Sequence, residues 1–218
     1  MTETGGIDPR LHSRMLEHLS YDYERWFTRD EVAALFDDSL LQLDRTALVT
    51  AFVPVLADKL TRQRLDAKAQ AEGKQAKRVP EVLFVCTHNA GRSQMAAVLA
   101  HHYAGDALHI RTGGSAPGGR IHPEVAQAMK QIGLSLDDEF PKPLTDEVVA
   151  AADVVVTMGC GDECPYLPGR RYEDWPIADP AGGTEQEVAA IRNDVDNHVR
   201  DLLVSLLPDL ALPAPARL

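Results

Sequence analysis

A buried strand, a short loop and a helix meet around one cysteine at residues 82–103. The run Val82–Val85 is apolar and rich in β-formers, as expected for a strand buried on both faces. Cys86 ends this run, and Arg92 and Ser93 follow a loop of small and polar residues, which gives the pattern C-x5-R-S. The residues Arg92–Tyr103 are predicted to form a helix. A strand that passes through a short loop into a helix predicts an α/β fold.

The loop after Cys86 has the properties of an anion site. A loop of this size can turn its backbone N–H groups inward, and the helix that follows presents its positive end to the same point. These dipoles favour the thiolate form of a cysteine. Arg92 adds a planar fork for two oxygens of a tetrahedral oxyanion, and Ser93 can donate a hydrogen bond to the sulfur. The predicted oxyanion-binding residues are Thr87, His88, Asn89, Ala90, Gly91 and Arg92.

The predicted chemistry is therefore nucleophilic attack by the sulfur of Cys86 on a phosphate-like centre. The alternative is a buried, unreactive cysteine at the end of a strand.

Strands and helices alternate through the rest of the chain. Strands are predicted at residues 81–86, 108–112, 153–158 and 170–175, and helices at 92–103, 122–132, 145–151 and 184–207. The last helix begins with a capping-box pattern, Thr184 to Glu187. This alternation predicts a parallel sheet with helices on both faces. The glycine-rich run Gly113–Gly119 predicts a flexible rim rather than a phosphate loop, because no helix begins at the right distance from it.

The first 78 residues are predicted to be helical throughout. Asp8 and Pro9 form an N-cap followed by proline at the first helical position, and Thr28–Glu31 is a capping-box pattern. A third apolar stripe runs through Val49–Leu60, where Pro54 is expected to kink or split the helix. We therefore predict three parts: a small helical bundle over residues 1–78, a catalytic domain over 79–210 and a disordered tail over 211–218. Because so small a bundle buries little apolar surface alone, a homodimer through residues 1–78 is expected.

Charge is unevenly distributed along the chain. The 218 residues carry a net charge of −11. Residues 1–78 contribute −1 (12 Lys and Arg against 13 Asp and Glu), and the remainder contributes −10 (10 against 20). The acidic catalytic domain cannot attract an anion from a distance, so the loop, the helix end and Arg92 must supply the binding field. The basic stretch Lys59–Arg78 is more typical of a solvated helix face than of a nucleic-acid contact.

The chain is predicted to be cytoplasmic, with no membrane partner. No apolar run approaches the length of a membrane span, and the first residues lack the pattern of a signal peptide. Three cysteines do not suggest the disulfide framework of a secreted protein.

Three motifs in order resemble the arsenate reductases built on the low-molecular-weight protein tyrosine phosphatase fold. They are Cys86–Ala96, Thr157–Cys160 after a predicted strand, and Asp179–Gly182 before the last helix. The resemblance covers roughly residues 80–207 and implies a four-stranded sheet of order 2-1-3-4. In that order the strands ending at Cys86 and Met158 are neighbours, and ligands bind at such switch points.

The resemblance also implies a thiol relay without a metal or organic cofactor. Cys86 attacks arsenate, Cys160 attacks Cys86 and releases arsenite, and Cys164 attacks Cys160 so that thioredoxin can reduce the resulting disulfide. Asp179 is the implied general acid that protonates the leaving oxygen. The three residues between Cys160 and Cys164 are fewer than in the thioredoxin-linked pattern. A reductase that uses mycothiol and mycoredoxin therefore stays open.

Other functions and roles also stay open. A low-molecular-weight protein tyrosine phosphatase would use the same pocket, because phosphate and arsenate share shape and charge. Against it, Ala181 and Gly182 follow the Asp-Pro pair where tyrosine-specific relatives place aromatic residues, and Gly91 stands where they keep a second cysteine. Cys160 and Cys164 could instead be packing residues or zinc ligands, although zinc needs about four ligands. A regulator that senses arsenic or redox state and binds DNA through the helical domain is the non-enzymatic alternative.

Overall fold

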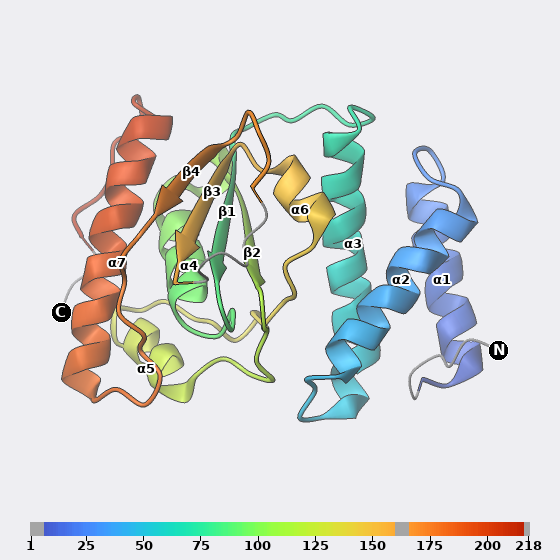
Figure 1. The fold of residues 1–218 in the computed structure, drawn as a ribbon, viewed down its shortest axis with the longest axis horizontal. Helices are drawn as coiled ribbons and strands as arrows, with labels where there is room; N and C mark the ends of the chain where they lie inside the picture. Colours follow the sequence, from blue (N-terminus) through green and yellow to red (C-terminus); the bar gives the residue numbers. More distant parts are fainter. Residues whose placement is uncertain (1–6, 160–165, 216–218) are drawn as a thin grey trace. The chain divides into compact units, whose positions relative to one another are not determined.

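The computed structural model describes residues 7–159 and 166–215, which belong to two compact units (Figure 1). Unit 1 comprises the chain up to Lys77 together with Thr145–Ala151, and unit 2 comprises Arg78–Leu144 and the chain from Ala152 onward. Within the described ranges, none of the helices has the length and apolarity that a membrane span requires.

Unit 2 is built on a parallel four-stranded sheet. Its strands are β1 (Glu81–Cys86), β2 (His109–Gly114), β3 (Val154–Met158) and β4 (Arg171–Asp174), in the order β2-β1-β3-β4. The predicted fold class and strand order are therefore confirmed. All residues of β1 are buried, because this strand is central and is paired on both sides. The register sets Cys86 opposite Gly114 of β2 and Met158 of β3, so the ends of three strands meet beside the cysteine.

Three longer helices complete unit 2. They are α4 (Arg92–Ala104), α5 (Pro123–Gln131) and α7 (Glu185–Leu206), with a short 3-10 turn, η2 (Gly105–Ala107), before β2. The predicted capping box at Thr184 starts α7, and α7 packs against both α4 and α5. Beyond α7, Leu212 packs against the core and Arg200 Nη1 donates to the carbonyl oxygen of Pro213. The described part of the predicted tail is therefore held on unit 2.

Unit 1 is an all-helical unit. It contains α1 (Pro9–Tyr23), α2 (Arg29–Asp44), the 3-10 turn η1 (Thr50–Phe52), α3 (Val53–Ala71) and α6 (Asp146–Ala151). Asp8 caps α1 and the capping box at Thr28 starts α2, as the sequence predicts. Of the kink or split predicted at Pro54, the structure has a split: the 3-10 turn η1 ends at Phe52, and Pro54 lies in the first turn of α3. In that turn the missing N–H of proline has no intrahelical partner to lose.

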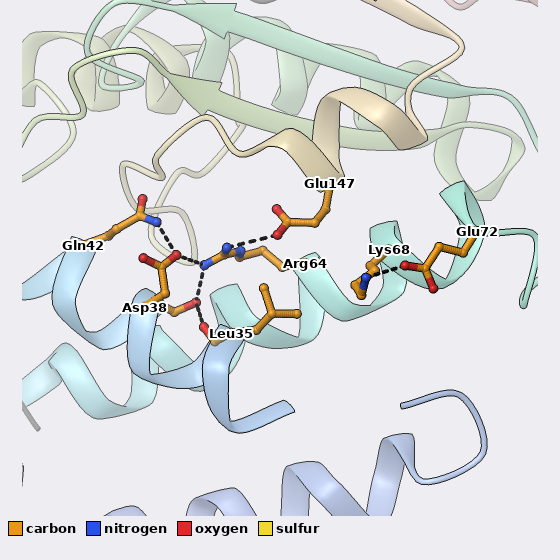
Figure 2. A network of polar contacts seen from close by, with 8 residues as sticks. Leu35, Asp38, Gln42, Arg64, Lys68, Glu72 and Glu147 are labelled. Carbon is orange, nitrogen blue, oxygen red and sulfur yellow. Dashed lines mark hydrogen bonds and ion pairs between the residues drawn. The ribbon is translucent and has the colours of Figure 1, made fainter. Parts of the chain in front are cut away.

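Helix α6 groups with the N-terminal helices, although the sequence boundary at residue 78 assigns it to the catalytic domain. It packs against α3, and the buried side chain of Arg64 on α3 joins it to the unit. Arg64 Nη2 donates to Glu147 Oε1 of α6 at 3.1 Å, and Nη1 donates to Asp38 Oδ2 of α2 at 2.6 Å and to Ser39 Oγ at 3.1 Å (Figure 2). A buried guanidinium is costly unless it is paired, so Arg64 requires α2 and α6 on either side of α3.

The contacts of Glu147 in this network change the pKa of its carboxylate. Burial disfavours its charged form, but the adjacent Arg64 guanidinium and the hydrogen bond outweigh that effect and hold the pKa of Glu147 below its ordinary value. The ionised Glu147 therefore stabilises the folded protein at pH values above about 4.3, the ordinary pKa of a glutamate. This stabilisation is lost as the pH falls from there through the lowered pKa of Glu147 in the folded protein.

Replacing Glu147 by Gln should lower the free energy of unfolding at pH 7 by about 1–3 kcal/mol, because the buried guanidinium loses a charged partner. Urea unfolding measures the loss. Glu17→Gln, an equal charge change at an exposed position of α1, should change stability little. The difference between wild type and Glu147→Gln should shrink as the pH falls below about 4. An equal difference at pH 7 and at pH 3.5 would contradict this account.

Candidate active site

Backbone hydrogen bonds fix the loop between β1 and α4 from outside. The carbonyl oxygen of Thr87 accepts from Ala116 N at 2.8 Å, that of His88 from Gly118 N at 2.9 Å, and that of Ala90 from His122 N at 3.0 Å. The carbonyl oxygen of Asn89 accepts from the Gln94 side chain at 3.1 Å, and that of Gly91 from Gln94 N and Met95 N in the first turn of α4. Every carbonyl of residues 87–91 is therefore engaged.

This arrangement points the N–H groups of the loop the other way. In a trans peptide, the carbonyl of one residue and the N–H of the next lie on opposite sides, and the described residues contain no cis peptide bond. Each N–H group of residues 88–92 consequently points away from the partner of the preceding carbonyl, which leaves these N–H groups available to an anion. Such a set of N–H groups at a helix N-terminus is an anion site.

Cys86 lies at the base of this loop and is the one cysteine within the described ranges. Its side chain is buried, and Ser93 Oγ lies 3.0 Å from Cys86 Sγ. Ser93 Oγ accepts a hydrogen bond from Asn89 Nδ2 at 2.8 Å. Because the serine oxygen already accepts from Asn89, its own proton is available to the sulfur. The geometry thus favours donation from Ser93 to a Cys86 thiolate.

The orientation of the Asn89 amide follows from a backbone group. Lys142 N donates to Asn89 Oδ1 at 2.8 Å, and a backbone N–H can only donate, so the other end of the amide, Nδ2, must face Ser93. Asn89 is also the one non-glycine residue of the described ranges with a positive φ, +47°. Left-handed backbone is rare outside glycine, and asparagine tolerates it better than most residues.

Arg92 lies between the segment of Asp179 and the end of β3. It is 8% exposed; its Nη2 donates to Asp179 Oδ2 at 3.0 Å and its Nη1 to the carbonyl oxygen of Ile177 at 3.3 Å. Gly159, immediately after β3, leaves room for this guanidinium, since a Cβ there would lie 2.6 Å from Arg92 Nη1. Thr87 Oγ1 donates to the carbonyl oxygen of Gly159 at 2.8 Å, so Gly159 contacts both the loop and the arginine.

The Asp179–Pro180 pair packs directly on the loop. A Cβ on Gly91 would lie 2.8 Å from Pro180 Cγ, so glycine at this position permits the close approach. Asp179 Oδ1 accepts from Ala181 N at 3.0 Å, and 48% of the Asp179 side chain is exposed. A carboxyl group that is fixed beside an arginine and open to solvent can exchange a proton at the edge of an anion site.

The structure brings together most of the residues singled out by the sequence. Cys86, Ser93, Arg92 and Asp179 form one connected site, and Thr87 and Asn89 fix its loop. Ala90 and Gly91 contribute backbone groups, and His88 is exposed. The proposed relay residues Cys160 and Cys164 lie outside the described residues.

Sequence reasoning missed several groups that hold the site. The flexible rim predicted over 113–119 is wrong in part: Gly113 and Gly114 belong to β2, and the segment that follows donates to the loop carbonyls. Thr112 Oγ1 lies 3.4 Å from Asn89 Oδ1, and the buried Lys142 Nζ donates to Thr112 Oγ1 at 3.1 Å and pairs with Glu139. Their only signal in sequence is a polar residue within a buried strand and a lysine between prolines.

Comparisons with known proteins agree on the family. Residues 81–211 match the model of the family described as low molecular weight phosphotyrosine protein phosphatase, and residues 12–69 match a protein-tyrosine-phosphatase-like N-terminal domain. The arsenate reductase of Bacillus subtilis is 33% identical over 130 residues, which span 55% of this chain and 92% of that protein.

Solved structures extend the likeness to both units. The Corynebacterium glutamicum thioredoxin-dependent arsenate reductase has a TM-score of 0.85 and 39% identity, covering 93% of this chain and all of that one. An arsenate reductase in the phosphate binding state has a TM-score of 0.54 and 26% identity, over 59% of this chain and 99% of that chain.

Gly159→Ala should weaken binding of inorganic phosphate about tenfold, the effect of about 1.4 kcal/mol, because the new methyl group displaces the Arg92 guanidinium. Isothermal titration calorimetry measures the affinity. The matched control is Gly133→Ala, since Gly133 has a similar φ of +78° but nothing within 4 Å of its Cβ position. Equal affinity in the two variants would show that Gly159 does not set the position of Arg92.

Proposed function

The chain belongs to the low molecular weight phosphotyrosine protein phosphatase family, and we propose that it is an arsenate reductase that produces arsenite with thioredoxin as the final reductant. The observation that carries the proposal is the likeness, over both units, to the thioredoxin-dependent arsenate reductase of C. glutamicum. The conclusion agrees with the three-motif resemblance in the sequence, and three cysteines suffice for the relay.

The first step is formation of a covalent bond between Cys86 Sγ and arsenic. The N–H groups of residues 88–92 and the Arg92 guanidinium hold the oxyanion, and Ser93 donates to the thiolate until it attacks. One arsenate oxygen leaves as water, and Asp179 supplies a proton to it. Because phosphate has the same geometry, this step alone does not distinguish a reductase from a phosphatase.

The second step transfers two electrons from sulfur to arsenic, and the third step moves the resulting disulfide. The thiolate of Cys160 attacks Cys86 Sγ, the S–As bond breaks and its electron pair stays on arsenic, which leaves as arsenite. Cys164 then attacks Cys160, which returns Cys86 to the thiolate and leaves a Cys160–Cys164 disulfide. Thioredoxin reduces this disulfide by the same exchange. The pairing of Cys86 with Met158 supports the first transfer, because Cys160 follows Met158 by two positions in the sequence.

Thioredoxin, thioredoxin reductase and NADPH should support arsenate-dependent NADPH oxidation. Cys164→Ser should reduce that turnover to background while retaining hydrolysis of p-nitrophenyl phosphate, and Cys86→Ser should abolish both activities. Unchanged thioredoxin-coupled turnover in Cys164→Ser would contradict the relay. Turnover with mycothiol and mycoredoxin but none with thioredoxin would favour the mycothiol-dependent alternative. Phosphate hydrolysis without any arsenate reduction would favour the phosphatase.

Within the same proposal, unit 1 is a dimerisation module. Leu48, Val49, Phe52 and Val55 are exposed apolar side chains around the connection between α2 and α3, with Phe52 62% exposed. Exposed apolar side chains gathered in one region mark interaction surfaces, and a second copy of the chain is the partner that is always present.

Light scattering at micromolar concentration should give the mass of a dimer. Phe52→Asp should shift that mass to the monomer, because a buried unpaired carboxylate is costly. Tyr21→Asp, at a 73% exposed position of α1, should leave the dimer intact. A monomeric wild-type protein would remove the dimer from the proposal.

A further inference from the structure

Gln94 is a buried amide that the reaction scheme above does not use. It lies in the first turn of α4, directly after Arg92 and Ser93, and has no exposed surface. Its Nε2 is 3.1 Å from the carbonyl oxygen of Asn89, 3.0 Å from Asn89 Oδ1 and 3.2 Å from the carbonyl oxygen of Phe140. The two hydrogens of this NH2 group are thus shared among three acceptors on two segments of unit 2.

The orientation of this amide is determined by its surroundings. Two of the three acceptors are backbone carbonyls, which can only accept, so the nitrogen end of Gln94 must face them. The opposite end, Oε1, is buried without a hydrogen-bond partner among the described residues. An unpaired buried acceptor is unfavourable, so the oxygen end of Gln94 gives no reason for an amide at this position. What only Gln94 supplies at this position is its donor group.

The donor group binds both ends of Asn89. It contacts the backbone oxygen and the side-chain oxygen of that residue at once, and thereby holds the left-handed conformation at φ +47°. Lys142 N binds the same side-chain oxygen but reaches only the side chain. Gln94 is therefore the side chain that fixes the peptide between Asn89 and Ala90. The carbonyl of this peptide must point toward Gln94 so that its N–H, that of Ala90, points the opposite way and is available to the anion.

We propose that Gln94 is a positioning residue: it holds Asn89 so that Asn89 donates to Ser93 and Ser93 donates to the Cys86 sulfur. Without the Gln94 donor, the Asn89 backbone can relax from its left-handed conformation and its amide can turn away from Ser93. The serine then no longer has a fixed proton for the thiolate. The proposal rests on the proposed function only in taking Cys86 as the nucleophile.

The test measures the reactivity of Cys86 itself. Rates of iodoacetamide alkylation, followed by mass spectrometry and peptide mapping of Cys86 between pH 5 and 9, should be about tenfold lower at pH 7 in Gln94→Met than in wild type. The midpoint of the pH profile should move upward. Gln127→Met, at an exposed position of α5, should leave the profile unchanged. Because the alkylation assay contains no arsenate, a failure of this prediction can be distinguished from a failure of the proposed arsenate reduction.

A double-mutant cycle separates positioning from packing. If Gln94 acts through Asn89, Gln94→Met should have little further effect on alkylation once Asn89 is replaced by Ala. Gln94→Glu, which keeps the size but replaces the donors by a carboxylate, should reproduce the loss if the Met variant does not fold. Wild-type alkylation in a folded Gln94 variant, or losses that add in the cycle, would overturn the proposal and leave Gln94 a packing residue.

Discussion

The site depends on outward hydrogen bonds to the carbonyl oxygens of residues 87–91. A loop can offer its N–H groups to an anion only if the oxygens of the same peptides have partners elsewhere. Here the partners are the segment 116–122, the first turn of α4 and the Gln94 side chain. The central position of β1 and the parallel neighbours β2 and β3 bring these donors to one edge of the sheet. The fold around the loop is thus the condition for the chemistry of Cys86.

Local fields outweigh the charge of the protein at this site. Unit 2 carries most of the net charge of −11, which repels an oxyanion at long range. Such repulsion between exposed charges is screened over about 8–10 Å at physiological salt. The inward N–H groups, the end of α4 and the Arg92 guanidinium act at contact distance, where screening is weak. An acidic surface is therefore compatible with an oxyanion substrate.

The sequence predicted best those features that local chemistry determines. Each of these features depends on a few adjacent residues. They are β1 over 81–86, the capping boxes at Thr28 and Thr184, and the C-x5-R-S loop. The split at Pro54 was predicted, but the apolar stripe did not show that α3 begins at Val53. The grouping of α6 with α3 and the anchoring of Asn89 by Lys142 depend on segments far apart in sequence. A single sequence does not encode those contacts as a pattern.

In the proposed reaction, electrons reach arsenate through a thiol relay within the chain. Intact mass of the fully reduced protein, measured after arsenate is added and all external thiol is removed, tests it most directly. The wild-type protein should lose about 2 Da, the two hydrogens lost in one disulfide, and Cys160→Ser should show no such loss. An unchanged mass in the wild-type protein would contradict the relay, because an outside thiol would then have to resolve the Cys86 adduct.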